Sequence, residues 1–333
     1  IALAGGSVGG IDVVDNGVLA DILEEMGQIF NIKGDRFRRQ AYAKAADVVR
    51  KLPDPIISGA SLKGVPGIGA GTIRRIDEIL NTGELEELGD LKQDSQVIAL
   101  RELRSVHGVG PSMCAELMRK KGVMSLKDLR AAVAGGTVHL NRVQMVGLRF
   151  AEEFSHKIPR AEVHEVEVAL QKILSEHVPD GQITICGSYR RGKPLCGDID
   201  CLLTSSAVTS DLPASAKGPL LRRYVEALRK SGLLVDDLAY GTSKYMGVCR
   251  LGPGRLHRRL DIRCIPHDQY FFGTLYFTGP RELSIELRLK AIEKGMVLNE
   301  YGLSNTTGFK VKATCERDIF EYLGVSYKEP TAR

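Results

Sequence analysis

Two aspartates lie one residue apart at the start of an apolar run, and this feature most restricts the fold. Asp198 and Asp200 flank Ile199, and the segment continues as Cys201-Leu202-Leu203. The run predicts a strand, on which side chains at positions i and i+2 point to the same face. Two adjacent carboxylates are costly to bury unless a cation neutralises them. The sequence therefore predicts a sheet with a site for a hard divalent cation such as Mg²⁺, which prefers oxygen ligands.

A third acid and a glycine-rich turn extend this pattern. Asp261 lies in the run Arg259-Leu260-Asp261-Ile262-Arg263, which predicts a neighbouring strand. Three acids around two metal ions about 3.5–4 Å apart form a site for in-line displacement at phosphorus. Upstream, the turn from Gly187-Ser188 to Arg191-Gly192 offers a hydroxyl, backbone N–H groups and a guanidinium to a terminal phosphate. Packing alone would not explain these glycines beside two acids, so we expect an enzyme acting at phosphorus.

The first half of the chain contains two similar glycine motifs. Residues 65–69 read Val-Pro-Gly-Ile-Gly, residues 106–110 read Val-His-Gly-Val-Gly, and a helical pattern follows each. Glycine allows a tight turn and a close approach of the backbone to a ligand. The helix that follows directs free N–H groups at the loop and so favours an anion. One such motif is also compatible with a simple helix–turn–helix, whereas two favour binding to a phosphate backbone.

The segment from Lys33 to Lys51 is strongly basic. It contains seven Lys or Arg residues and two Asp residues, although the net charge of the whole chain is only +5. A solvated helix face is the simpler explanation for such a run, and a polyanionic ligand is the functional one. The adjacent glycine motifs favour the second explanation.

Length and composition set further limits. A chain of 333 residues predicts two or more domains. Strands expected at 183–186, 199–203, 244–251 and 260–265 mix with helices at 162–174 and 219–230, which predicts an α+β second half with a surface loop over 205–218. Hydrophobic and charged contents of 43% and 26% exclude wholesale disorder. No apolar stretch approaches the roughly 20 residues of a bilayer-spanning helix. The seven cysteines contain no C-x-x-C pair, so we expect reduced thiols.

The motifs GSYRRG at 187–192, GDID at 197–200 and RLDIR at 259–263 resemble the active site of the nucleotidyltransferase superfamily. The two glycine motifs, the basic helix and the run Tyr276-Phe277-Thr278-Gly279 narrow this resemblance to the family X DNA polymerases, the family of DNA polymerase beta. The resemblance implies an α+β fold. Its expected parts are a flexible leader at 1–14, a helical lyase-like DNA-binding domain with the first helix-hairpin-helix at 15–95, a second helix-hairpin-helix subdomain at 96–160, a mixed-sheet catalytic palm at 161–270 and a small C-terminal α/β lobe for the nascent base pair at 271–333.

The resemblance also implies catalytic roles. Asp198 and Asp200 would hold two Mg²⁺ ions. Asp261 would bind only the catalytic ion and accept the proton of the primer 3′-hydroxyl, with Arg259 modulating its charge. Glu300 and Tyr301 would belong to a network that couples closure of the lobe to chemistry.

Further residues are implied as ligand contacts. Contacts to the incoming dNTP would come from Lys157, Ser188, Arg191, Gly197, Tyr276, Phe277, Gly279, Arg281 and Ser284. Contacts to DNA would come from Arg38, Tyr42, Lys63, Gly67, Gly69, Arg75, Gly108, Gly110 and Arg288. Backbone carbonyls that hold Na⁺ or K⁺ at the hairpins would come from Lys63, Val65, Ile68, Arg104, Val106 and Val109.

The chain departs from the family pattern at several positions. Arg75 stands where the family has the lysine that forms a Schiff base with the abasic sugar, and Gly71 replaces a phosphate-binding lysine. A guanidinium, with its pKa above 12, cannot serve as an amine nucleophile, so the lyase reaction requires another lysine such as Lys44. Arg281 and Ser284 replace an acid and an asparagine in the dNTP lobe, which predicts altered fidelity.

Three functions can be compared with these residues. The resemblance favours a template-directed DNA polymerase that fills short gaps in base-excision repair. The expected partners are gapped or nicked DNA with a 5′-phosphate, dNTPs and repair proteins, for a monomer without membrane contact in the nucleus or mitochondria. A targeting segment upstream of Ile1 would not be visible. A template-independent nucleotidyltransferase fits the two-acid motif equally well but not the paired hairpins. A non-catalytic DNA-binding scaffold does not explain three retained acids.

Overall fold

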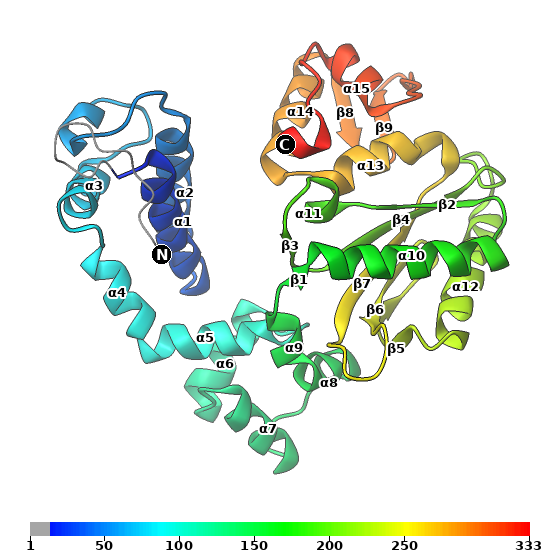
Figure 1. Ribbon diagram of the computed structural model, residues 1–333, viewed down its shortest axis with the longest axis horizontal. Helices are drawn as coiled ribbons and strands as arrows, with labels where there is room; N and C mark the ends of the chain where they lie inside the picture. Colours follow the sequence, from blue (N-terminus) through cyan, green and yellow to red (C-terminus); the bar gives the residue numbers. More distant parts are fainter. Residues whose placement is uncertain (1–13) are drawn as a thin grey trace. The chain divides into compact units, whose positions relative to one another are not determined.

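The computed structural model describes residues 14–333, except for the side chains of residues 214–217. The predicted leader, apart from Val14, lies outside the described residues. The chain divides into two compact units, residues 1–139 and 140–333, which we describe one at a time (Figure 1).

The first unit is helical where it is described. Its helices are α1 (Asn16–Ile32), α2 (Arg36–Lys51), the 3₁₀ turn η1 (Gly59–Leu62), α3 (Ala70–Thr82), α4 (Glu86–Gln93), α5 (Ser95–Ser105), α6 (Pro111–Lys121) and α7 (Leu126–Ala134). Asp15 and Asp35 cap α1 and α2 by accepting bonds from backbone N–H groups of the first turn. The apolar stripe of α1 is buried as its spacing predicts, with Leu19, Leu23 and Met26 fully inaccessible.

The second unit is built on a mixed five-stranded sheet. The strand order is β2-β4-β7-β6-β5, with β2 at Gly181–Ile185, β4 at Ile199–Ser205, β7 at Arg258–Cys264, β6 at Lys244–Cys249 and β5 at Leu234–Tyr240. Only β4 and β7 pair in parallel. The short strands β1 (Ile158–Pro159) and β3 (Leu195–Cys196) pair separately. Before and beside the sheet lie α8 (Arg142–Arg149), α9 (Ala151–Ser155), α10 (Arg160–His177), α11 (Gly187–Arg190) and α12 (Ala214–Lys230).

The alternation of side chains along β4 and β7 separates a core face from an acidic face. Ile199, Cys201, Leu260 and Ile262 are buried in one cluster with residues of α10 and α12. Side chains alternate along a strand, so the residues between them, including Asp200, point to the opposite face.

A smaller lobe completes the second unit. It comprises η2 (His267–Gln269), α13 (Tyr270–Thr278), α14 (Arg281–Glu293), the hairpin of β8 (Met296–Asn299) and β9 (Gly302–Asn305), α15 (Glu316–Leu323) and η3 (Pro330–Ala332). Its core includes Phe272, Leu287, Leu303 and Phe320. This arrangement confirms the predicted α+β class.

Two local predictions need correction. Strand β5 was not expected, and it occupies the edge of the sheet beside β6. The segment 205–218, expected as a loop, becomes helical at Ala214, with Pro219 inside α12. Pro219 lacks one N–H and so removes one backbone bond near the start of the helix, which the remaining turns tolerate.

All seven cysteines are free and six of them are buried. No helix among the described residues is both long enough and apolar enough to cross a bilayer.

Candidate active site

The three predicted acids converge on one face of the sheet. The parallel pairing of β4 and β7 sets Asp200 directly opposite Asp261, and Asp198 immediately precedes β4. One carboxylate oxygen from each of the three lies within 4.8 Å of the others. The i and i+2 spacing and the adjacent strand therefore bring together the residues that the sequence singled out.

The three acids repel one another, and Asp200 and Asp261 are largely buried, although Arg259 lowers the pKa of both. Burial, with the nearby charges of Asp198 and Asp261, raises the pKa of Asp200 to about 7. Burial also raises the pKa of Asp261, although Arg259 opposes this shift. The Oδ1 atom of Asp261 is buried and has no hydrogen-bond partner among the described residues. A divalent cation with oxygen ligands would satisfy both the charge and this orphaned oxygen.

Arg259 contacts the acids from one side. Its Nη2 donates to Asp198 at 2.9 Å and to Asp261 at 3.2 Å. A cavity of about 110 Å³ is lined by Asp200 and Asp261 but not by Asp198 or Arg259. The residues present fit a site for a divalent metal.

Strand β2 leads into the glycine turn for which the sequence predicts phosphate binding. Gly187 has φ +57°, and a Cβ at this position would lie 2.4 Å from Oδ2 of Asp200. Glycine is required here because the backbone turns through the left-handed region against an acid. Ser188 and Arg191 follow in and after α11, and Arg191 Nη1 donates to the carbonyl of Thr278 at 2.5 Å.

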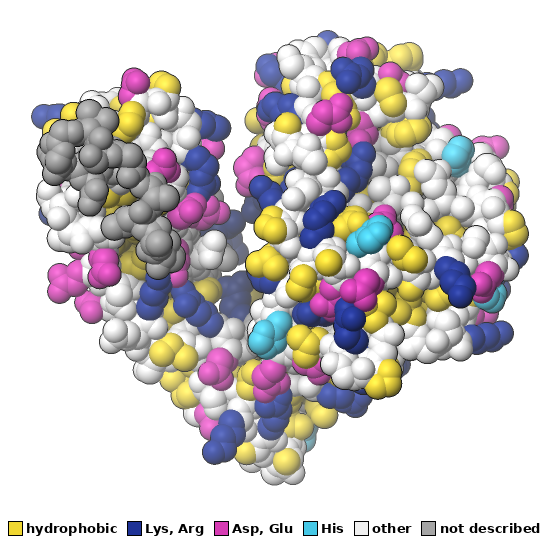
Figure 2. Space-filling model, viewed as in Figure 1, with side chains coloured by type: hydrophobic (Ala, Val, Ile, Leu, Met, Phe, Trp, Pro, Cys, Tyr) yellow, Lys and Arg dark blue, Asp and Glu magenta, His cyan; other side chains and the backbone are white. Residues whose placement is uncertain are grey.

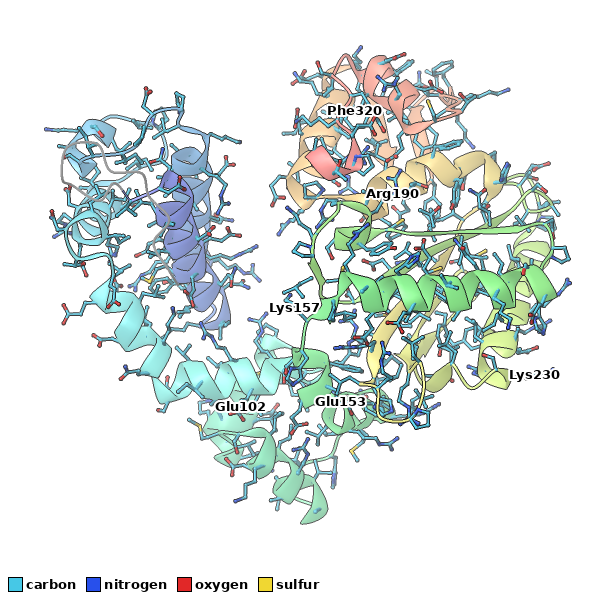
Figure 3. All side chains as sticks on the ribbon, viewed as in Figure 1. Glu102, Glu153, Lys157, Arg190, Lys230 and Phe320 are labelled. Atoms are coloured by element: carbon cyan, nitrogen blue, oxygen red, sulfur yellow. The ribbon has the colours of Figure 1, made fainter. Side chains whose placement is uncertain are left out.

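Arg190, which the sequence analysis did not single out, ties this turn to the C-terminal lobe. It donates to Thr278 Oγ1 at 2.8 Å and to Glu316 at 2.5 Å, and Arg333 donates to the other oxygen of Glu316 at 2.8 Å. Figure 3 labels Arg190 at this junction. On the face drawn in Figure 2, several Lys and Arg side chains lie around α11.

Two groups of predicted nucleotide contacts are Lys157 with Gly197, and Tyr276 with Phe277. The Nζ atom of Lys157 lies 3.7 Å from the position that a Cβ of Gly197 would take. Tyr276 and Phe277 pack edge to face at 5.0 Å, and the Arg288 guanidinium lies 5.2 Å from the Tyr276 ring centre.

The remaining predicted nucleotide residues follow α13. Gly279 has φ +67°, and a Cβ there would lie 3.4 Å from Arg191. Ser284 on α14 donates to the carbonyl of Pro280 at 3.3 Å, and Arg281 at the start of α14 is exposed. Glu300 and Tyr301 lie in the turn between β8 and β9.

Two cavity residues were missed in the sequence analysis. Lys244 and Arg263 line the 110 Å³ cavity beside the acids, and they are direct partners across β6 and β7. Arg263 lies two residues after Asp261, so the strand period could have placed it on the acidic face. Nothing in the sequence indicated which strand would bring Lys244 there.

The two glycine motifs of the first unit have nearly the same backbone. In each motif the N–H of residue four bonds to the carbonyl of residue one: Ile68 to Val65 at 3.1 Å and Val109 to Val106 at 3.0 Å. The middle glycines, Gly67 and Gly108, have φ of +101° and +86°. Gly69 and Gly110 are the N-cap residues of α3 and α6 in extended conformations. Lys63 is exposed before the first motif, and Arg104 before the second donates to the carbonyl of Asn31 at 3.3 Å.

A layered cluster of cations and aromatic rings surrounds Arg75. Phe30 and Tyr42 stack with ring centres 5.5 Å apart, and the guanidinium groups of Arg38 and Arg75 lie over the Phe30 and Tyr42 rings respectively. Arg75 also bonds to Glu87 through Nε at 2.7 Å and Nη2 at 2.6 Å. The position expected to hold an amine nucleophile is therefore occupied by an ion-paired guanidinium.

Family comparisons agree with this geometry. The palm and thumb models of DNA polymerase beta match residues 157–267 and 273–333. A helix-hairpin-helix model matches residues 14–85, and the fingers model of DNA polymerase lambda matches residues 101–155. The chain belongs to the family X DNA polymerases.

Individual family X relatives align along nearly the whole chain. DNA polymerase lambda of Rattus norvegicus is 33% identical over 332 residues, covering 95% of this chain and 56% of the relative. DNA polymerase lambda of Arabidopsis thaliana is 34% identical over 337 residues, covering 94% and 61%. A DNA nucleotidylexotransferase of Gallus gallus is 28% identical over 345 residues, covering 96% and 67%. The chain thus spans about six-tenths of the length of the two lambda relatives.

Proposed function

We propose that this family X chain is a template-directed DNA polymerase that fills short gaps during base-excision repair. The convergence of Asp198, Asp200 and Asp261 on one sheet face, where burial and the other two acids raise the pKa of Asp200, is the observation that carries the proposal. We also propose the domain boundaries and the residue roles that the family resemblance implies.

The acids and the glycine turn divide the chemistry between them. Asp198 and Asp200 would hold two Mg²⁺ ions, and Asp261 would bind only the catalytic one. When bound, the ions supply Lewis acidity and neutralise charge at the reacting phosphate. Asp261 accepts the proton of the primer 3′-hydroxyl, whose oxygen bonds to the α-phosphorus as pyrophosphate leaves. Arg259, which contacts Asp198 and Asp261, partly neutralises their charge and favours the ionised form of Asp261.

The glycine turn positions the triphosphate. Ser188 and Arg191 would contact the β- and γ-phosphates, as would Lys157, which lies beside Gly197. Tyr276 and Phe277 would flank the sugar. These groups act by positioning and by neutralising charge.

The first unit would bind the phosphate backbone of DNA. The two hairpins direct the N-terminal N–H groups of α3 and α6 at phosphates, assisted by Na⁺ or K⁺ held by main-chain carbonyls. Arg38 and the exposed Lys63 would contact the 5′-phosphate of the gap. Because phosphate contacts release counterions, DNA affinity falls steeply with salt.

The proposal includes polymerase activity without efficient excision of 5′-deoxyribose phosphate. Arg75 cannot form a Schiff base, and its ion pair with Glu87 holds the guanidinium in place. DNA repair in the nucleus or in mitochondria is the proposed setting.

A second candidate function is template-independent nucleotidyl transfer, which the relative named DNA nucleotidylexotransferase suggests. Extension of a primer by each dNTP, against each of the four template bases, separates the two candidates. We expect Mg²⁺-dependent incorporation of the complementary nucleotide into a one-nucleotide gap with a 5′-phosphate. Equal extension on all four templates, or extension of a lone single strand, would favour the second function.

A further inference from the structure

A cavity of the second unit lies apart from the three acids. It has a volume of about 540 Å³ and lies between the end of the palm, at Ser210 and Asp268, and the lobe segment 299–314. A volume of this size is in the range of small-molecule sites. Neither the acids nor the Gly187 turn contributes to its wall.

The floor of this cavity is apolar and one wall is aromatic. Phe272 of α13 and Leu303 of β9 form buried parts of it, with 3% and 0% of their surfaces exposed. Tyr301 adds a ring that is 43% exposed. An aromatic group could therefore stack on Tyr301 while it covers apolar surface.

The charges at the rim favour an anion. Lys310 and Lys312 line the cavity, both are exposed, and neither has an ion-pair partner among the described residues. Asp268 on the palm side is already engaged, because its two carboxylate oxygens accept bonds from the backbone N–H and the hydroxyl of Ser210. Two unpaired ammonium groups thus face one carboxylate whose hydrogen bonds are made.

The cavity shares a wall with the nucleotide side of the lobe. Phe272 and Asn299 line it and also line a second cavity of about 20 Å³ beside Tyr276 and Arg288. An occupant of the large cavity would therefore pack against α13, the helix that carries Tyr276.

We propose that this cavity is a second ligand site for a small aromatic anion: a planar ring on Tyr301 and the apolar floor, with an acidic group between Lys310 and Lys312. The site does not depend on the polymerase assignment, because none of the three acids and none of the proposed dNTP contacts lines it. Adenosine 5′-monophosphate is a suitable probe, since it lacks the β- and γ-phosphates that Ser188 and Arg191 would bind.

Methyl NMR of the whole chain in EDTA, titrated with adenosine 5′-monophosphate, tests the site. We expect saturable shifts at Leu303 and Val311, and at least tenfold weaker binding of adenosine alone or inorganic phosphate alone. The variant Lys310→Ala/Lys312→Ala should bind the probe at least tenfold more weakly. The matched variant Lys290→Ala/Lys328→Ala removes two lysines of the same lobe that pair with Glu293 and Glu286, and it should bind within twofold of the parent.

Three results would overturn the proposal. One is the absence of saturable shifts, and another is shifts confined to Ile199 and Ile262 in the strands of the acid cluster. The third is equal weakening in the two lysine variants, which would show that general charge and not this cavity governs binding.

Discussion

The acid cluster of the palm and the cluster around Arg75 in the first unit differ in how their charges are paired. In the palm, the Arg259 guanidinium contacts two of the three carboxylates, and the pKa of Asp200 rises to about 7 because its charge is buried beside two other acids. In the first unit Arg75 makes two close contacts to Glu87 and stacks on Tyr42. The first site groups three carboxylates that could hold a metal ion, whereas the second pairs one guanidinium with one carboxylate. The difference supports the proposal of nucleotidyl transfer without an efficient lyase reaction.

The largest effect should follow removal of charge from the acid cluster. We expect Asp200→Asn to lower the rate of gap filling at least about 10³-fold, because a metal ligand is lost at the reacting phosphate. Binding to gapped DNA should stay within a few-fold of the parent, since phosphate contacts elsewhere supply it. Single-turnover extension and a binding titration measure the two quantities. Glu176→Gln on the exposed face of α10 is the control, and an active Asp200→Asn would mean that the site is misplaced.

The second prediction concerns the ion pair between Arg75 and Glu87. The parent should trap weakly with borohydride on a 5′-incised abasic duplex, and Arg75→Lys with Glu87→Gln should trap at least about tenfold more. A lysine amine is a nucleophile, and removing Glu87 removes a charge that would favour its protonated form. Arg75→Lys alone is the matched comparison and should gain less. Strong trapping by the parent would show that another lysine performs the reaction.

The third prediction concerns the turn beside the acids. Gly187→Ala should lower the free energy of unfolding by about 1–3 kcal/mol, because alanine is strained at φ +57° and its Cβ would contact Asp200. Gap filling should fall with it, since the acid must move. Gly252→Ala is the control, because nothing lies within 4 Å of its added Cβ. Urea unfolding measures both variants, and equal stability would contradict the observed turn.

The smallest effect should separate the two glycine positions of the hairpin motif. Gly67→Ala should cost about 1 kcal/mol of stability, because φ is +101° and the added Cβ would contact the side chain of Lys44 at 2.8 Å. Gly110→Ala should be nearly neutral, since Gly110 is extended and its Cβ position is open. Thermal unfolding of the two variants side by side tests this order, and the reverse order would refute it.

The sequence was most informative where local periodicity decides the structure. The two-residue spacing of Asp198 and Asp200 fixes their common face, and the two glycine motifs fix the hairpins that precede α3 and α6. The sequence was less informative where strand order decides. Strand β5 and the approach of Lys244 to the acids depend on which strands become neighbours. The pairing of Arg75 with Glu87 joins two helices and has no local signal.

The central claim is that the three acids together bind a pair of divalent cations. Electron paramagnetic resonance with Mn²⁺ can count bound ions in the complex with gapped DNA, a dideoxy-terminated primer and the matching dNTP. We predict two ions per chain, and their loss in Asp198→Asn/Asp200→Asn. Equal occupancy in the parent and in this double variant would contradict the account.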